Sequence, residues 1–142
     1  MRLFEINGGV FGSTGKIMFG IAAEARKQGM EVICASPITS TNKDRQPNEK
    51  YYKIGNYTCR NVLLSKITGF NGCFAYFATK KLLKEMDNFS PDIVHLHTLH
   101  NSYVNLPLLF NYLSKKNIKV IWTLHDCWAF TGQCPHFVFE NC

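Results

Sequence analysis

Two segments of this chain place histidines where an apolar run ends. His125 and Asp126 follow the run 120–124, which predicts a strand buried on both faces, and His95 and His97 lie in a second run that begins at residue 92. In an open parallel sheet, ligands bind beyond the carboxyl ends of the strands. An imidazole there can donate to a sugar hydroxyl or a phosphate oxygen, and Asp126 can fix its tautomer or bind a hydroxyl itself.

His95 and His97 flank Leu96, so both side chains are predicted to point to one face of their strand. Such histidines are commonly hydrogen-bonded residues of a core or a sheet edge, and this interpretation stays open. His100 and Asn101 follow just beyond the strand, where a polar ligand could reach them. If the two histidine-bearing strands are neighbours in the sheet, their histidines form one polar patch.

A glycine-rich segment, residues 7–15, follows the first apolar run and precedes a stretch with helical spacing. Backbone N–H groups of such a loop, together with a helix N-terminus, can face a phosphate. The candidate phosphate-binding residues are Gly9, Gly12, Ser13, Thr14, Gly15 and Lys16. The alternative is a tight turn that only starts a helix. The P-loop pattern fails at Val10 and Ile17, and no frame supplies the dinucleotide pattern Gly-x-Gly-x-x-Gly.

Cysteines and a histidine near the end of the sequence raise the question of a metal site. Cys127, Cys134, His136 and Cys142 are spaced loosely, whereas structural zinc sites usually draw their ligands from close pairs. We therefore expect free thiols in a loop, no bound metal and no other cofactor. The alternative is a metal site of Cys134, His136 and Cys142 that residues beyond Cys142 complete.

The composition is that of one globular domain. The chain has 142 residues, of which 46% are hydrophobic, and it contains no run of about 20 apolar residues. The apolar stretch before the first glycines is too short for a secretory signal, so we expect a cytoplasmic protein whose six cysteines stay reduced. The net charge of +6 favours an anionic partner: the phosphates of a nucleotide, a lipid phosphate or a membrane surface.

Hydrophobic periodicity predicts alternating strands and helices along the chain. Strands are expected at 2–6, 30–35, 51–55, 92–97 and 118–124, and helices at 16–28, at 104–116 and as a broken pair within 60–89. Residues 36–50 are expected to form a surface loop, and Gly29 to end the first helix. Right-handed crossovers make such strands parallel. The predicted fold class is therefore α/β, with a doubly wound parallel sheet.

The broken helix pair carries aromatic residues, Phe70, Phe74, Tyr76 and Phe77, followed by a group of lysines. Aromatic and basic side chains together can seat helices at an anionic membrane surface. Core-facing helices with a solvated lysine face explain the same pattern equally well.

Three segments together resemble the N-terminal domain of retaining glycosyltransferases of family 4, in particular the bacterial branch that builds capsular and extracellular polysaccharide. They are the glycine segment 8–16, the segment PDIVHLH at 91–97 and the segment WTLHDCWAFTG at 122–132. The third segment is the most specific, and the likeness covers nearly the whole chain.

The resemblance implies a GT-B architecture, in which two Rossmann-like domains face a cleft and this chain forms the acceptor-side domain. It implies that the glycine segment approaches the donor diphosphate and that His125 with Asp126 lies beside the transferred sugar. His97, His100 and Asn101 would line the acceptor side. The implied substrates are a nucleotide sugar and a saccharide or lipid-linked saccharide, handled at the inner face of the plasma membrane, with no role for nucleic acid.

Enzymes of this kind bind the donor mainly through a C-terminal domain that carries paired glutamates, and residues 1–142 offer no such pair. We therefore expect one domain of a truncated or split glycosyltransferase, inactive alone because a cleft needs both walls. The rival interpretation is a non-catalytic domain that binds a saccharide or assists a separate donor-binding subunit.

Overall fold

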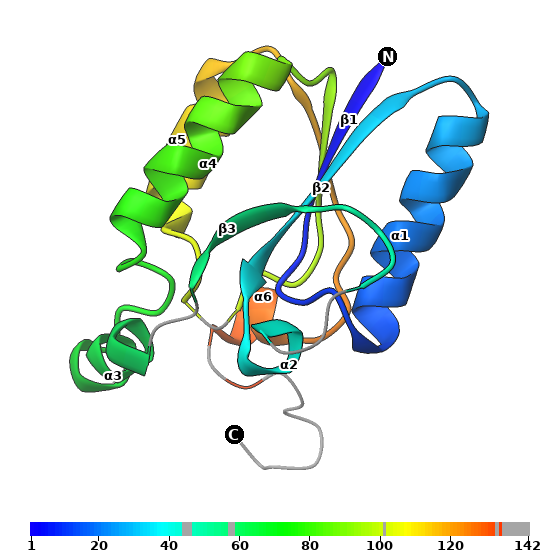
Figure 1. The fold of residues 1–142 in the computed structure, drawn as a ribbon. Coiled ribbons are helices and arrows are strands. Elements are labelled where there is room, and N and C mark those ends of the chain that lie inside the picture. The colour runs from blue at the N-terminus through cyan, green and yellow to red at the C-terminus, as the bar shows by residue number, and fades with distance from the viewer. Residues whose placement is uncertain (44–46, 57–58, 101, 133, 135–142) are drawn as a thin grey trace.

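The computed structural model describes residues 1–43, 47–56, 59–100, 102–132 and 134 (Figure 1). Its strands are β1 (Arg2–Ile6), β2 (Glu31–Ile38), β3 (Tyr52–Asn56), β4 (Ile93–Leu96) and β5 (Lys119–Trp122). Its helices are α1 (Gly12–Lys27), α2 (Ser40–Lys43), α3 (Cys59–Thr68), α4 (Tyr76–Phe89), α5 (Leu106–Lys115) and α6 (Trp128–Thr131).

These strands form one parallel sheet in the order β3-β2-β1-β4-β5. The chain runs outward from β1 through β2 to β3, and then returns to the other side of β1 for β4 and β5. The predicted doubly wound parallel sheet is therefore confirmed. Its strand order reverses between β1 and β4, and such a point is where open α/β sheets bind ligands at the carboxyl edge.

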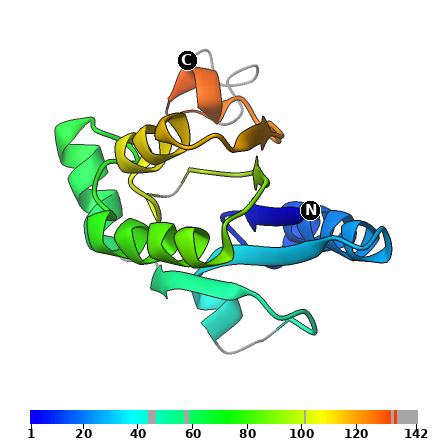
Figure 2. The same ribbon diagram turned by 90° about the horizontal axis from the view of Figure 1, so that it is seen from above.

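The helices cover the two faces of the sheet unequally (Figure 2). Helix α1 lies on one face, and α4 and α5 lie side by side on the other. Helix α1 buries Met18, Ala22 and Ala25 at helical spacing, which explains its packing on the sheet. It ends as predicted at Gly29, which has a φ of +79° and donates its N–H to the Arg26 carbonyl at 3.0 Å.

The main core lies between the sheet and the α4–α5 layer. Phe4 and Ile6 of β1 and Val94 and Leu96 of β4 are fully buried there, because alternate side chains of a central strand point to this face. Leu82, Met86 and Leu109 from the two helices complete the same cluster. This packing fixes the position of the middle strands, and the candidate site lies at their carboxyl ends.

The predicted burial of the last strand is wrong. Val120 and Ile121 of β5 are 41% and 42% exposed, and Leu124 just beyond is 53% exposed. The reason is position, because β5 pairs with β4 and is the edge of the sheet in the described part of the chain. An apolar run has the same sequence signature at the edge as at the centre.

Other boundaries differ modestly from the predictions. Helix α1 begins at Gly12, so half of the predicted glycine loop is helical, and β2 extends to Ile38 into the segment expected to be a loop. The broken helix pair within 60–89 is confirmed as α3 and α4. Among the described residues, no helix combines the length and the apolar character that crossing a membrane requires.

Candidate functional site

The strand register brings Glu5 and the histidines together at the carboxyl edge. Glu5 of β1 pairs with His95 of β4, and His95 pairs with Ile121 of β5. Because paired residues in a parallel sheet point to the same face, Glu5 lies against His95 and, two residues on, His97. His125 lies three residues beyond the end of β5 and its ring reaches His97, so side chains far apart in the sequence form one cluster.

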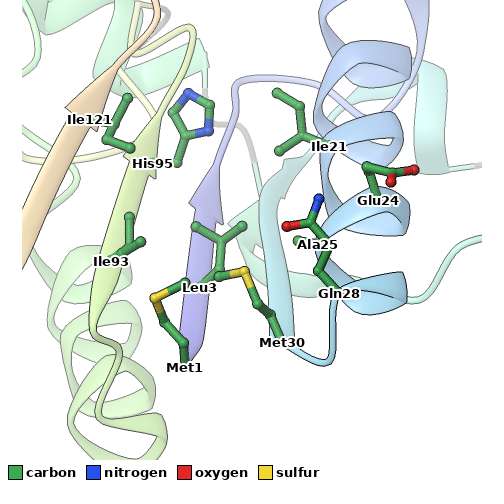
Figure 3. A pocket seen from close by; sticks show the side chains of 10 residues that line it. All are labelled: Met1, Leu3, Ile21, Glu24, Ala25, Gln28, Met30, Ile93, His95 and Ile121. Carbon is green, nitrogen blue, oxygen red and sulfur yellow. The ribbon is translucent and has the colours of Figure 1, made fainter.

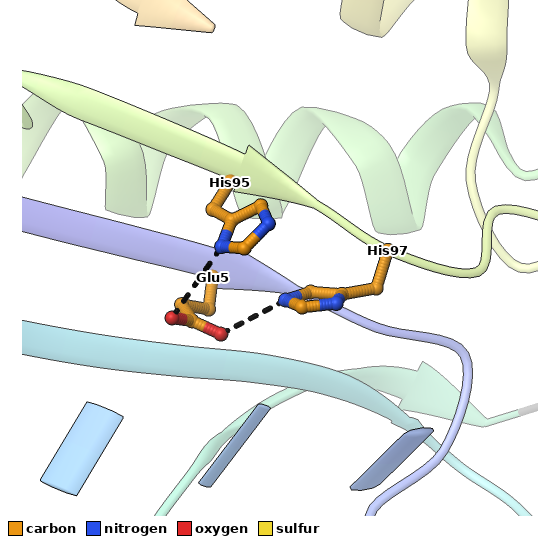
Figure 4. Close-up of side chains that lie close together, drawn as sticks. All are labelled: Glu5, His95 and His97. Atoms are coloured by element: carbon orange, nitrogen blue, oxygen red, sulfur yellow. Dashed lines mark hydrogen bonds and ion pairs between the residues drawn. The ribbon is translucent and has the colours of Figure 1, made fainter. Parts of the chain in front are cut away.

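Glu5 is the buried centre of this cluster (Figure 4). Its side chain is 0% exposed, and its Oε2 accepts a hydrogen bond from Nε2 of His97 at 3.0 Å. Its Oε1 lies 3.7 Å from Nδ1 of His95, beyond hydrogen-bond length but close enough for electrostatic contact. His95 uses its other ring nitrogen, Nε2, to bond Thr123 Oγ1 at 2.8 Å.

The surroundings of Glu5 have opposing effects on its pKa. Burial acts to raise it, but the facing imidazoles of His95 and His97 outweigh that effect, so the pKa of Glu5 is lowered from 4.5. The side chain is therefore a carboxylate at neutral pH. A buried carboxylate without such partners would be strongly destabilising, so the two histidines and Glu5 form one structural unit.

His125 extends the cluster toward the surface. Its Nε2 lies 3.0 Å from Nδ1 of His97, and the two rings stack with an interplanar angle of 17°. The pKa of His125 is lowered by burial and by its neighbours His97 and His95, which outweigh the opposite influence of Asp126. The lowered pKa favours the neutral form of the His125 imidazole, which is half-buried at the end of the sheet.

Asp126 makes its own contacts beside His125. Its Oδ2 lies 3.2 Å from Nε2 of His100, and its Oδ1 accepts the Trp128 N–H at 3.0 Å. These contacts tie the loop after β4 to the start of α6. His97, rather than Asp126, is thus the residue that hydrogen-bonds to His125 and can fix its tautomer. Asn101, the remaining predicted acceptor-side residue, lies outside the described residues.

The glycine segment lies at the same edge of the sheet and is anchored by Asn7. This buried side chain donates to the Gly9 carbonyl at 2.8 Å and to Thr14 Oγ1 at 3.3 Å. Its Oδ1 accepts the N–H groups of Gly8 at 2.9 Å and Thr98 at 3.3 Å. Asn7 therefore joins the end of β1 to the segment after β4, and so fixes the glycine segment next to the histidine cluster.

Of the predicted phosphate-binding residues, those from Gly12 to Lys16 form the start of α1, and Gly9 lies in the loop before it. The N-cap residue, Phe11, makes no side-chain cap hydrogen bond. Gly12, Ser13 and Lys16 are exposed, whereas Gly15 is buried. A cavity of about 370 Å³ adjoins this turn, lined by Gly8, Gly9, Val10, Phe11, Gly12, Thr39 and Thr41.

A second cavity, also about 370 Å³, lies between α1 and strands β4 and β5 (Figure 3). It is almost entirely apolar, with Leu3, Ile21, Ile93 and Ile121 in its wall. His95 reaches it from the sheet. This cavity sits on the face of the sheet rather than at the carboxyl edge, and His95 is the residue that it shares with the histidine cluster.

Glu5, His95 and His97 are also a potential metal-ligand set, since their ligand atoms lie within 4.8 Å of one another. His97 Nε2 and Glu5 Oε2 share a hydrogen bond at 3.0 Å in this structure, so a metal ion bound by both atoms would have to displace that proton. Of the predicted metal alternative, His136 and Cys142 lie outside the described residues. Cys134 is half-buried, and its carbonyl accepts a hydrogen bond from Thr131 Oγ1 at 2.6 Å.

Sequence reasoning missed Glu5, Asn7 and Thr123. A charged residue inside the apolar run 2–6 was the available signal for Glu5, because a carboxylate in a buried strand needs a partner. Asn7 carried a weaker signal, as an Asn that begins a turn after a strand. Nothing in the sequence alone pairs Thr123 with His95.

Comparisons with known proteins agree with this architecture. Residues 15–139 match the sequence model of Glycosyltransferase Family 4. The chain is 41% identical over 129 residues to the putative colanic acid biosynthesis glycosyl transferase WcaC of Escherichia coli (strain K12). That alignment covers 81% of this chain but 31% of the relative, so the chain spans about a third of the length of that protein. No solved structure matches the chain. With most of its length matching the family model, this chain belongs to glycosyltransferase family 4.

Proposed function

We propose that this chain is the acceptor-side domain of a nucleotide-sugar-dependent glycosyltransferase that acts in surface polysaccharide synthesis. The observation that carries the proposal is the position of His125, whose ring lies 3.0 Å from the buried His97 at the carboxyl edge of the sheet, in a chain that matches the family 4 model. The relative named for colanic acid biosynthesis supports the polysaccharide assignment. In this proposal, a glycosyl group passes to a saccharide hydroxyl, on a free or lipid-linked acceptor, with retention at the anomeric carbon.

The glycine segment is proposed to meet the donor diphosphate. The N-cap residue of α1 makes no side-chain cap hydrogen bond, and an anion at this helix N-terminus would accept hydrogen bonds from backbone N–H groups and interact favourably with the helix dipole. Ser13 and Lys16 are exposed on the same turn, and a cavity adjoins it. These groups would stabilise the leaving diphosphate without a metal ion.

His125 and His100 are proposed to contact the sugars, each from a half-buried position at the sheet edge. His97 is fully buried, so its proposed role is exerted through His125 rather than by touching the acceptor. The donor-binding wall of the cleft is proposed to come from polypeptide outside residues 1–142, as part of the same protein or as a separate subunit.

The test is glycosyl transfer by a complete enzyme that contains this domain, measured with labelled nucleotide sugars and lipid-linked saccharides extracted from cells. Replacing His125 with Ala should lower the turnover about 10²-fold or more. The fold should survive, because the side chain is half-buried at the edge of the core. The matched control is Lys115→Ala on the exposed end of α5, which should leave transfer unchanged.

Full activity in the His125→Ala enzyme would overturn the site assignment. Absence of transfer by the wild-type enzyme, restored when a companion polypeptide is added, would instead favour the split-enzyme interpretation. Binding of saccharides without transfer under any of these conditions would favour a non-catalytic binding domain.

A peripheral contact with an anionic membrane is part of the proposal. Ile67, Phe70 and Phe77 are 72%, 66% and 81% exposed on α3, α4 and their connection. Lys66 and Lys80 stand exposed on the same two helices, so apolar and basic side chains occur together. Exposed apolar groups with neighbouring positive charge suit the interface of an anionic bilayer, which is where a lipid-linked acceptor would be found.

Co-sedimentation with vesicles tests this contact. The chain should bind phosphatidylglycerol vesicles and lose most of that binding when Phe70 and Phe77 are replaced with Ser. The control is Ile17→Ser, which removes an exposed apolar residue from α1 on the other face of the sheet. Equal binding by both variants, or equal binding to neutral phosphatidylcholine vesicles, would rule out a specific anionic contact through this patch.

A further inference from the structure

The proposed function leaves Glu5 without a role, although Glu5 is the most thoroughly buried charge near the site. It lies on the central strand β1, and its Oε2 bonds to His97, which in turn bonds to His125. The two bonds, each 3.0 Å long, form a continuous line from the interior of the sheet to its carboxyl edge. Hydrogen-bond donor and acceptor rules restrict where the protons can sit along that line.

The first proton is fixed by Glu5. A carboxylate can only accept hydrogen bonds, so Nε2 of His97 must carry the hydrogen that lies between them. A neutral imidazole carries one N–H, and its other nitrogen is an acceptor. In its neutral form, His97 therefore presents Nδ1 as an acceptor to His125.

The second proton follows from the first. Since Nδ1 of neutral His97 accepts, Nε2 of His125 must donate across the 3.0 Å contact. When His125 is neutral as well, its Nδ1 is left unprotonated. Among the described residues, Nδ1 of His125 has no hydrogen-bond partner, and the half-buried ring can present it to a ligand.

We propose that Glu5 and His97 are positioning residues that hold His125 in the Nε2–H tautomer, with Nδ1 available to accept a hydrogen bond from a sugar hydroxyl. The buried Glu5 carboxylate thus determines the tautomer of His125 through the imidazole of His97, which lies between them. The role toward a sugar rests on the proposed function, whereas the tautomer follows from the two hydrogen bonds when both imidazoles are neutral.

The same line can carry a proton inward. If a hydroxyl gives its proton to Nδ1 of His125, the Nε2–H bond of His125 can break as a new N–H bond forms at Nδ1 of His97. The hydroxyl then has lost one proton, His125 is neutral again, and His97 carries the positive charge beside the Glu5 carboxylate. The other groups facing His125 are His95 from β4 and Asp126, which His100 engages.

The test is nitrogen-15 NMR of the 142-residue chain, labelled at histidine, at a pH above the ordinary imidazole pKa. Long-range couplings within each ring identify which nitrogen carries the hydrogen. The expected result is the Nε2–H tautomer for both His97 and His125. An Nδ1–H tautomer for His125 in the wild-type chain would overturn the proposal without any variant being made.

Two variants separate positioning from a general structural effect. Glu5→Gln replaces the carboxylate with a group that can donate as well as accept, so His97 and His125 should populate both tautomers. His95→Gln is the matched control, because His95 faces Glu5 but has no hydrogen bond to His125. An unchanged His125 tautomer in Glu5→Gln, or an equal change in His95→Gln, would also overturn the proposal.

Metal analysis and the transfer assay complete the test. The purified chain could instead contain stoichiometric zinc, and Glu5→Gln could lose both the zinc and the expected tautomers of His97 and His125. That result would assign the cluster to metal binding and overturn the proposed positioning role. In the complete enzyme, Glu5→Gln should lower the turnover and shift its pH profile, with the KM for the donor unchanged. If His97 and His125 show the expected tautomers but the complete enzyme transfers no sugar, the proposed function is rejected and the positioning of His125 still holds.

Discussion

A buried carboxylate in a central strand is tolerated here because its charge has defined neighbours. Glu5 is fully buried, and imidazoles of His95 and His97 face its two oxygens. Removing the partners of a buried charge typically costs about 3–5 kcal/mol, so the three side chains stabilise the fold only as a set. The same set orients His125, which means that stability and site geometry depend on the same hydrogen bonds.

The free energy of unfolding should fall in two steps as the pH is lowered. The folded-state pKa of His125 lies below its ordinary value of 6.5, so the unfolded chain takes up this proton first. Stability is therefore fully present above 6.5 and decreases below it until the folded imidazole is also protonated. Urea unfolding at a series of pH values, for the wild type and His125→Asn, should show this step in the wild type alone.

The second step belongs to Glu5, whose folded-state pKa is lowered from 4.5. Its contribution is present above 4.5 and is lost as the pH falls through the folded-state pKa, because the protonated side chain can no longer pair with the imidazoles. The Glu5→Gln variant should be less stable at neutral pH and lack this step. A variant profile parallel to that of the wild type below pH 4.5 would contradict the lowered pKa.

At the scale of single elements, Gly15 in the first turn of α1 allows the helix to pack closely against the preceding loop. A Cβ on Gly15 would lie 2.5 Å from the Val10 carbonyl oxygen, so the helix can approach the preceding loop only with glycine there. Gly20, five residues further along the same helix, has open space where a Cβ would be placed. Close packing therefore requires glycine at position 15 but not at position 20, although both residues lie in α1.

Alanine at these two positions should have opposite effects. Gly15→Ala should destabilise the chain by about 1–3 kcal/mol, because the backbone of Val10 must move. Gly20→Ala should stabilise it by about 0.5–1 kcal/mol, since glycine is a poor residue inside a helix. Thermal and urea unfolding of both variants check the prediction, and a neutral Gly15→Ala would mean that the first turn of α1 is not tightly packed.

The side chain of Asn7 links the glycine segment to the segment after β4. Its Oδ1 accepts N–H groups from Gly8 and Thr98, so an Asn7→Ala variant leaves two donors without that partner. The expected loss of stability is about 1–3 kcal/mol for each donor left buried and unpaired. Hydrogen exchange should show faster exchange at Gly8 and Thr98, with exchange in α4 changed only through the overall stability. Exchange rates unchanged at both amides would contradict the anchoring role.

Elements with strong periodicity could be predicted from the sequence, and long-range pairings could not. The alternation of apolar runs with helical spacing was enough to predict the parallel sheet, and Gly29 was enough to end α1. The pairing of Glu5 with His97 joins residues 92 positions apart, and it depends on the register of β1 against β4. The exposure of β5 likewise depends on its neighbours, which an apolar run does not reveal.

At the scale of the whole molecule, the sheet is covered unequally. Helices α4 and α5 cover one face, whereas α1 lies over the β1–β2 half of the other. The face beside α1, toward β4 and β5, holds the apolar cavity with Ile93 and Ile121 in its wall. Strand β5 adds exposed apolar side chains and the backbone groups of a sheet edge. Surfaces of this kind promote pairing with another chain.

This 142-residue chain should therefore associate with itself through β5 as its concentration rises. Ile121→Lys places a charge on the edge strand and in the wall of the apolar cavity, so it should weaken the association. Phe77→Ser is the control, since it removes an 81% exposed apolar residue from α4 and leaves β5 unchanged. Light scattering over a range of concentrations would measure the mean mass of each variant. A larger effect of Phe77→Ser than of Ile121→Lys would place the self-association on the α3–α4 patch instead of the sheet edge.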